Sequence, residues 1–243
     1  CLDAQIAAGN GAKRALIGDG GEFTYAALDA KVSAFAAHLC GSHIARGDRV
    51  LIRMWNCAEF VIGFLALVKI GAVPVTQNTA TGLADVEYVL GHSDSVAAIA
   101  LDEQAEPLRH LRDRLPKGLI VARGAKPGET SFEAATACGA IATADTAADD
   151  PAFMCYTSGT TGRPKGIVHA HRWIVARGDA NRDRVPPLPG DVVMAAGEWS
   201  FISLLGHNVL FALRNGVTGA KLALQLLERE SSTTLDEPFR VAQ

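Results

Sequence analysis

The sequence predicts an α/β fold built on a mostly parallel sheet. Segments with strand-like and helix-like patterns alternate through residues 24–122, which is typical of βαβ units. The 243 residues are 49% hydrophobic and 20% charged, an ordinary globular composition with enough apolar side chains for a core. A buried-looking strand at residues 152–156 also runs directly into a loop rich in Ser, Thr and Gly. The elements are taken below in chain order.

Residues 24–39 predict the first helix, because apolar side chains recur on one face at helical spacing. These side chains are Tyr25, Leu28, Val32, Phe35, Ala36 and Leu39. Gly41 follows as a stop signal. A turn at Gly47-Asp48 then leads into a short apolar strand at residues 49–54.

A second helix is expected from Phe60, with Asn56 as its N-cap and Glu59 returning the capping bond. Residues 60–68 are apolar nearly all round, so this helix should be deeply buried and end at Gly71. Residues 72–76 read as the next strand, which Pro74 predicts to be an edge strand or a strand end.

The alternation continues, with helices expected at residues 83–90 and 103–115 and strands at residues 96–101 and 119–122. Residues 126–150 lack periodicity and predict a surface connection.

The second half of the chain repeats the strand and helix patterns with less regularity. After the strand at 152–156 we expect an extended segment at 166–171 and a helix starting within 172–178. A proline-rich loop at 182–190, a strand at 192–195 and an apolar helix at 202–213 follow.

Composition excludes several classes of function. The formal net charge of -3, with no basic cluster, argues against nucleic-acid binding and against an anionic membrane surface. The longest apolar run, residues 60–68, is far short of the roughly 20 residues of a membrane span, and no signal-peptide pattern is seen. Five cysteines without a C-x-x-C pair indicate reduced thiols. We therefore expect a cytoplasmic protein.

The segment TSGTTGRPKG, residues 157–166, carries the residue types that bind a polyphosphate. Four hydroxyl side chains fall within residues 157–161, and three glycines and Lys165 complete the segment. Glycines let the backbone curl so that its N–H groups point inward, and a lysine neutralises phosphate charge. The segment is not a P-loop, because Gly166 rather than Ser or Thr follows Lys165 and strands are expected on both sides.

The ordered string YTSGTTGRPKG, residues 156–166, resembles the signature loop of the adenylate-forming (AMP-binding) superfamily and matches its pattern [YF]-T-S-G-[ST]-T-G-x-P-K-G at every fixed position. Other segments are similar to family segments in the same order: FTYAAL at 23–28, GDRV at 47–50, LVKIGAVPV at 67–75, and PGD at 189–191 with EWSF at 198–201. Acyl-CoA synthetases and aryl-CoA ligases are the nearest groups.

The resemblance implies the αβα-layered, parallel-sheet N-terminal domain of an adenylate-forming enzyme. Such enzymes are acid–CoA ligases that use ATP and Mg²⁺ to turn a small carboxylic acid into an acyl adenylate, and coenzyme A then takes the acyl group. The phosphate-binding residues would be Thr157, Ser158, Gly159, Thr160, Thr161, Gly162 and Lys165, with Thr161 and Lys165 acting in catalysis.

Two further residues, Trp199 and His207, fall where family members line the carboxylate pocket, although an aromatic residue near an apolar helix is also an ordinary core residue. His169 and His171 alternate on one expected strand and face one side. No third ligand is nearby, so packing or hydrogen bonding, rather than a metal site, is the interpretation of this pair.

The resemblance covers residues 13–219, so the domain boundaries expected are 1–219 for the front part of the AMP-binding domain and 220–243 for an amphipathic and polar tail. The later family segments and the small C-terminal lid domain are not found in these 243 residues. We therefore expect a fold that is incomplete, a portion without full activity, and an open sheet edge that favours association with a second copy or a complementing chain. Two alternatives stay open, an amino-acid adenylation fragment and a non-catalytic nucleotide-binding remnant. The acid itself is not specified.

Overall fold

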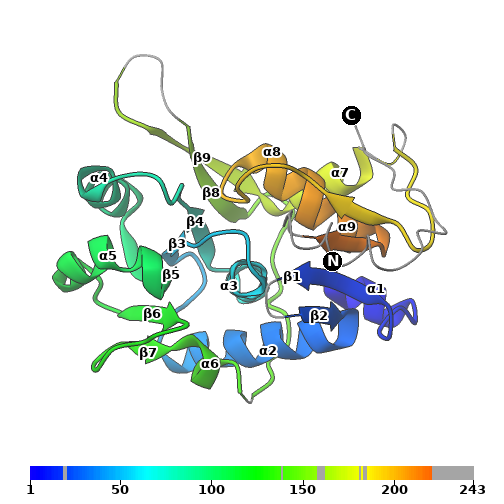
Figure 1. Ribbon diagram of the computed structural model, residues 1–243, viewed down its shortest axis with the longest axis horizontal. Helices are drawn as coiled ribbons and strands as arrows, with labels where there is room; N and C mark the ends of the chain where they lie inside the picture. Colours follow the sequence, from blue (N-terminus) through cyan, green and yellow to red (C-terminus); the bar gives the residue numbers. More distant parts are fainter. Residues whose placement is uncertain (19–20, 138, 158–161, 181, 183–184, 221–243) are drawn as a thin grey trace, which may run out of the picture.

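The computed structural model describes residues 1–18, 21–137, 139–157, 162–180, 182 and 185–220. Within these residues the strands form a larger sheet of seven strands, in the order β7-β6-β5-β3-β4-β8-β9, and a smaller sheet of four, in the order β10-β11-β1-β2 (Figure 1). The strands of the larger sheet are β3 (Arg49–Arg53), β4 (Val73–Thr76), β5 (Ser95–Leu101), β6 (Leu119–Ala122), β7 (Thr130–Ser131), β8 (Pro151–Thr157) and β9 (Lys165–Ala170). All its neighbouring pairs are parallel except β8 and β9, so the α/β prediction is confirmed.

Helices connect many of the strands in the described chain. They are α1 (Leu2–Ala7), α2 (Tyr25–Gly41), α3 (Ala58–Lys69), α4 (Leu83–Ser93), α5 (Glu106–His110), α6 (Phe132–Ala135), α7 (His171–Ala180), α8 (Ile202–Leu204) and α9 (Phe211–Asn215). Short 3₁₀ turns lie at Asp102–Gln104 and Arg112–Arg114. None of these helices is long and apolar enough to cross a membrane.

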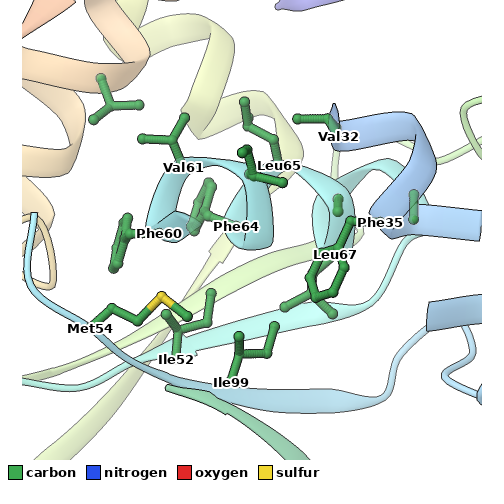
Figure 2. Close-up of a cluster of buried hydrophobic side chains, with 14 of the residues drawn as sticks. Val32, Phe35, Ile52, Met54, Phe60, Val61, Phe64, Leu65, Leu67 and Ile99 are labelled. Carbon is green, nitrogen blue, oxygen red and sulfur yellow. The ribbon is translucent and has the colours of Figure 1, made fainter. Parts of the chain in front are cut away.

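The larger sheet has an apolar cluster on each face. Along β3, Val50 and Ile52 face the cluster that holds α2 and α3, while Leu51 between them faces the cluster of α4 and α5. This alternation follows from the two-residue period of a strand and explains why the central strands read as continuous apolar runs. Figure 2 shows α3 between the sheet residues Ile52 and Ile99 and the helix α2.

Helix α3 is buried on nearly every side, as its sequence predicts. The Phe64 side chain is fully buried and lies 5.5 Å, centroid to centroid, from Phe153 of β8. The predicted cap was wrong: the N-cap residue is Cys57, without a side-chain capping bond. The Asn56 side chain instead donates to the Gly197 carbonyl and accepts from the Trp199 N–H, because these distant backbone groups come within 2.6 and 2.7 Å of it.

Pro74 does not mark an edge strand, because β4 lies between β3 and β8. Pairing with β8 begins only at Val75, so the missing N–H of Pro74 falls beside the start of that ladder, at a strand end.

Three segments differ from the structure that their sequence patterns predict, two helices being interrupted and one predicted surface connection containing regular elements. Residues 103–115 form α5 and two 3₁₀ turns rather than one helix. Residues 126–150 contain β7 and α6, whose Phe132 is buried in the core. Residues 202–213 begin as α8 and continue through a π-helical segment, Leu205–Leu210, into α9.

The smaller sheet was not expected as a unit. Its strands are β1 (Arg14–Gly18), β2 (Gly21–Thr24), β10 (Val192–Met194) and β11 (Thr218–Ala220). β1 pairs with β11 in parallel, with Leu16 beside Gly219. The Tyr25 hydroxyl lies within hydrogen-bond distance of the Ala212 and Val217 carbonyls, at 3.1 and 2.8 Å, and joins the start of α2 to the segment before β11.

Candidate nucleotide-binding site

The predicted phosphate loop lies between two strands, as the sequence indicates, and the structure shows that these strands, β8 and β9, are antiparallel. In the register of β8 and β9, Thr157 stands opposite Lys165, so both lie where the hairpin opens toward the loop. Figure 1 shows this hairpin extending past α4. Ser158, Gly159, Thr160 and Thr161 lie outside the described residues.

Two positions of the motif require glycine for different reasons. Gly162 has φ +138°, in the region that side chains rarely adopt. Gly166 lies against the preceding strand: a Cβ there would come within 3.1 Å of both the Met154 sulfur and the Tyr156 ring. The first glycine permits the turn, and the second permits close packing of the two strands.

The two predicted phosphate ligands at the ends of the strands, Thr157 and Lys165, are both exposed. In the part of the chain that the structure describes, no carboxylate pairs with Lys165. Its ammonium group is therefore available to an anion, which fits the chemistry of an ATP phosphate.

Helix α4 contacts both limbs of this hairpin, which the sequence did not predict. The Tyr88 hydroxyl donates to the Pro164 carbonyl at 3.1 Å, and the Arg163 guanidinium lies 5.1 Å from the centre of the Tyr88 ring. On the other limb, His92 Nδ1 and the Tyr156 hydroxyl are 2.7 Å apart. Burial raises the pKa of Tyr156 to about 12, so its hydroxyl stays protonated and can donate.

Other polar groups gather beyond the carboxyl ends of β3 and β4, the same edge of the sheet at which β8 ends. Arg53 is 4% exposed and donates to the carbonyls of Gln104, Asn78, Thr79 and Thr81. Burial lowers its pKa, opposed by the Glu198 charge. Glu198 also accepts from the Thr79 N–H at 3.0 Å. In open α/β sheets, ligands bind outside the carboxyl ends of the strands. Arg53 therefore holds the backbone of the loops at the edge where a ligand is expected.

Unpartnered polar atoms are found in the same region. Both amide atoms of Gln77 and the hydroxyl oxygens of Thr79 and Ser200 are buried without a hydrogen bond among the described residues. Such groups are costly unless a water, a ligand or further chain pairs with them. Nothing in the sequence pattern singles them out.

The two predicted pocket residues have different surroundings. Trp199 is 1% exposed and its ring lies 6.1 Å from that of Phe60, with its Nε1 unpaired in the described structure. His207 is exposed on the π-helical segment, where Nδ1 lies 2.6 Å from the Ser203 carbonyl and Nε2 lies 2.6 Å from Arg177 Nη2. Among the described residues no hydrogen bond or ring contact joins either side chain to Lys165, and their pocket role stays a prediction.

The histidine pair does not share a strand, because β9 ends at Ala170 and His171 opens α7. His169 stacks on Phe153 with a ring separation of 4.7 Å. Burial lowers the pKa of both histidines. Among the described residues, no group of three or more His, Cys, Asp and Glu side chains could hold a metal ion.

A family model for the AMP-binding enzyme matches residues 3–227. The chain belongs to the AMP-binding enzyme family. Its match covers the hairpin with Thr157 and Lys165, the α4 support and both sheets, so the family assignment made from the loop motif is confirmed.

Relatives of this AMP-binding chain include ligases for aromatic and for fatty acids. It is 33% identical over 246 residues to the benzoate–CoA ligase of Thauera aromatica, covering 97% of this chain and 45% of the relative. It is 35% identical over 158 residues to the long-chain-fatty-acid–CoA ligase FadD13 of Mycobacterium tuberculosis, covering 61% of this chain and 29% of that protein. The chain thus spans less than half the length of these curated relatives.

The fold is also found in solved structures of the family. The apo structure of Mycobacterium smegmatis MbtA superposes with a TM-score of 0.84 at 26% identity, covering 97% of this chain and 45% of that one.

Proposed function

We propose that this chain binds the phosphates of ATP in an acid–CoA ligase, which activates a carboxylic acid as an acyl adenylate and transfers the acyl group to coenzyme A. The observation that carries the proposal is the complete family motif on a hairpin in which Thr157 and Lys165 stand opposite each other. The exposed Lys165 has no ion-pair partner among the described side chains, so a phosphate can take that place.

In this reaction ATP supplies the α-phosphorus that the carboxylate attacks, and pyrophosphate leaves. Lys165 would bind the β- and γ-phosphate oxygens and stabilise the charge that accumulates on the departing pyrophosphate. Thr157, with the hydroxyls of Ser158, Thr160 and Thr161 and the backbone at Gly159 and Gly162, would orient the same groups. Mg²⁺ would enter with the nucleotide, since this ion is commonly held through substrate phosphates.

Among acids, we place an aromatic acid first. The benzoate ligase aligns with 97% of this chain, whereas the fatty-acid ligase aligns with 61%. The segment 199–203 also lacks an aspartate that could pair with an α-amino group, which disfavours an amino-acid substrate. Trp199 and His207 are the residues that we propose for the acid pocket.

The experiment compares ligase activity in the natural gene product and in a lysine variant. ATP, Mg²⁺, coenzyme A and a panel of benzoate, hydroxybenzoates and fatty acids are supplied, and AMP and thioester are measured. We expect AMP release that depends on an aromatic acid. Lys165→Ala should lower acid-dependent ATP–pyrophosphate exchange about 100-fold, as for other residues that stabilise transition-state charge, with little change in thermal stability because the side chain is exposed.

Lys165→Arg keeps the positive charge and is the matched variant, expected to retain more activity than Lys165→Ala. ATP binding without AMP release for any acid would favour the non-catalytic nucleotide-binding alternative. Equal exchange in the wild type and Lys165→Ala would remove the loop from the chemistry. For residues 1–243 alone we expect ATP binding and no thioester; steady acid-dependent AMP release would show that these residues suffice.

A further inference from the structure

We propose that Tyr88 and His92 of α4 are positioning residues that hold the two limbs of the phosphate loop and thereby place Lys165 for its ligand. The proposal rests on the proposed function, because it assigns how the same ATP-binding loop is held. The α4 anchor is defined as Tyr88 and His92 together with the loop residues that they contact, Arg163, Pro164 and Tyr156.

The returning limb is held by Tyr88 in two ways. Its hydroxyl donates to the carbonyl of Pro164, the residue directly before Lys165, at 3.1 Å. Its ring lies under the Arg163 guanidinium at 5.1 Å, within the range of a cation–π interaction. The backbone that leads into Lys165 is therefore fixed by a neutral hydrogen bond and a ring.

The outgoing limb is held by His92. Its Nδ1 lies 2.7 Å from the hydroxyl of Tyr156, the residue directly before Thr157, and the two rings meet edge to face at 5.7 Å. Tyr88 and His92 are four residues apart on α4, on the same side of the helix, and their rings are 5.3 Å apart. One helix thus contacts the residues immediately before Thr157 and immediately before Lys165.

The helix is also held to the sheet by residues outside the anchor. Val86, Val89 and Leu90 are the buried apolar residues of α4, and they belong to the cluster beneath the sheet. Tyr88 is half-buried and packs against this cluster, whereas His92 is exposed. Leucine at position 88 keeps an apolar side chain against the cluster, so Tyr88→Leu should leave the helix in place. A loop held before the ligand arrives loses less freedom on binding, which raises affinity.

Trypsin cleavage at Lys165–Gly166 measures the anchor without any ligand. Arg163 is followed by proline and resists cleavage, and Lys165 is paired with Thr157 until the hairpin opens. Losing one hydrogen bond and a cation–π contact should speed cleavage about tenfold in Tyr88→Leu, and about fivefold in Tyr88→Phe, which loses the hydroxyl alone. Glu87→Gln, on the same helix but paired with Arg114, is the matched control and should cleave like the wild type.

The second measurement is the dissociation constant of ATP with Mg²⁺, alongside the melting temperature. Tyr88→Leu should weaken ATP binding about tenfold with little change in the melting temperature, because leucine keeps an apolar side chain against the cluster. If the melting temperature of Tyr88→Leu falls, variants of the exposed Arg163 are used to test the anchor instead. Arg163→Gln should cleave faster and bind ATP more weakly, and Arg163→Lys, which keeps a cation over the ring, should restore both.

The outcomes separate the anchor from the function. Unchanged cleavage in both Tyr88→Leu and Arg163→Gln overturns the anchor. Faster cleavage with unchanged ATP affinity overturns its positioning role. Faster cleavage in variants of a wild type that does not bind ATP leaves the mechanical contact in place and overturns the proposed function.

Discussion

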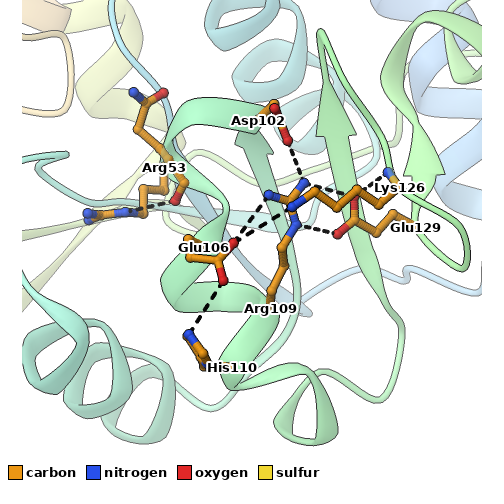
Figure 3. A network of polar contacts seen from close by, with 8 residues as sticks. Arg53, Asp102, Glu106, Arg109, His110, Lys126 and Glu129 are labelled. Carbon is orange, nitrogen blue, oxygen red and sulfur yellow. Dashed lines mark hydrogen bonds and ion pairs between the residues drawn. The ribbon is translucent and has the colours of Figure 1, made fainter.

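The two edges of the larger sheet are secured by different chemistry. At the β7 edge, Arg109 donates to Glu129 at 2.7 Å and to Asp102 at 2.6 Å, and the Glu129 side chain is only 3% exposed (Figure 3). At the β9 edge the described contacts to α4 are aromatic rings and hydrogen bonds, and Ile167 and Val168 are 44% and 53% exposed.

The difference shows what each edge can do. At the β7 edge the charge of Arg109 is neutralised by neighbouring carboxylates, which makes a strong structural contact and leaves little attraction for a ligand. At the β9 edge the side chains that support the hairpin include no carboxylate among the described residues, so the positive charge of Lys165 remains available. If the β9 edge binds an anion as proposed, support by groups without negative charge leaves Lys165 free to attract it.

The largest effect is expected from removing the cation at the β7 edge. Arg109→Met would leave the buried Glu129 carboxylate without its main partner and should lower the free energy of unfolding by about 3 kcal/mol. Urea denaturation followed by circular dichroism measures the change.

Arg114→Met is the control for this variant, because it removes the same charge from a neighbouring turn. Arg114 pairs with Glu87 at the surface, with side chains 45% and 56% exposed, so the cost should be below about 1 kcal/mol. Similar losses in the two variants would contradict a special role for the buried pair.

A smaller, pH-dependent effect should distinguish the charged edge from the neutral one. Hydrogen bonds from Arg109 lower the pKa of Glu129 below its ordinary value. A carboxyl group whose folded pKa is lowered stabilises the fold above its unfolded pKa, about 4.3, and loses that stabilisation as the pH falls through the folded value. Glu129→Gln should therefore cost about 2 kcal/mol at pH 7. The difference from the wild type should shrink below about pH 4.

Urea midpoints for the wild type and Glu129→Gln between pH 7 and pH 3 provide the measurement. Other carboxyl groups with lowered pKa, such as Asp3 and Glu133, titrate equally in both proteins, so the difference isolates Glu129. A difference that stays constant over this range would contradict the charge-based account.

The smallest effect is expected at the β9 edge. A Cβ in Gly166→Ala would press on the Met154 sulfur and the Tyr156 ring, both at 3.1 Å, and these side chains can yield by a few tenths of an ångström. The cost should be about 1 kcal/mol. Gly41→Ala, at the end of α2 with no atom within 4 Å of its Cβ, is the matched control and should cost nothing by thermal melting. Equal melting temperatures for the two variants would show that the hairpin is less tightly packed than its geometry indicates.

The sequence predicts the position of a strand best where a single local factor, such as burial on both faces, determines it. The strands β3, β6 and β8 agree with the expected segments within one or two residues, because parallel strands buried on both faces are continuous apolar runs. Strands β1 and β11 could not be found in this way. They are short, and their pairing joins residues at opposite ends of the described chain, which local patterns do not encode.

The site shows the same division. The order of residues in the loop predicts Thr157 and Lys165 as phosphate ligands, and the flanking apolar runs correctly predict that they lie at strand ends. The α4 anchor has no such signal, since Tyr88 and His92 read as ordinary residues of an amphipathic helix. Asn56 was assigned to a cap because capping rules are local, whereas its partners, Gly197 and Trp199, are distant in sequence.

The pairing of β1 with β11 has a consequence for synthesis of the protein. The Thr218 hydroxyl donates to the Arg14 carbonyl across 204 positions of the chain. At translation speeds of roughly 5–20 residues per second, β1 leaves the ribosome about 10–40 s before its partner exists. During this interval the edge of β1 that pairs with β11 is unpaired in the nascent chain. A chaperone that binds exposed strands could act on it in that time.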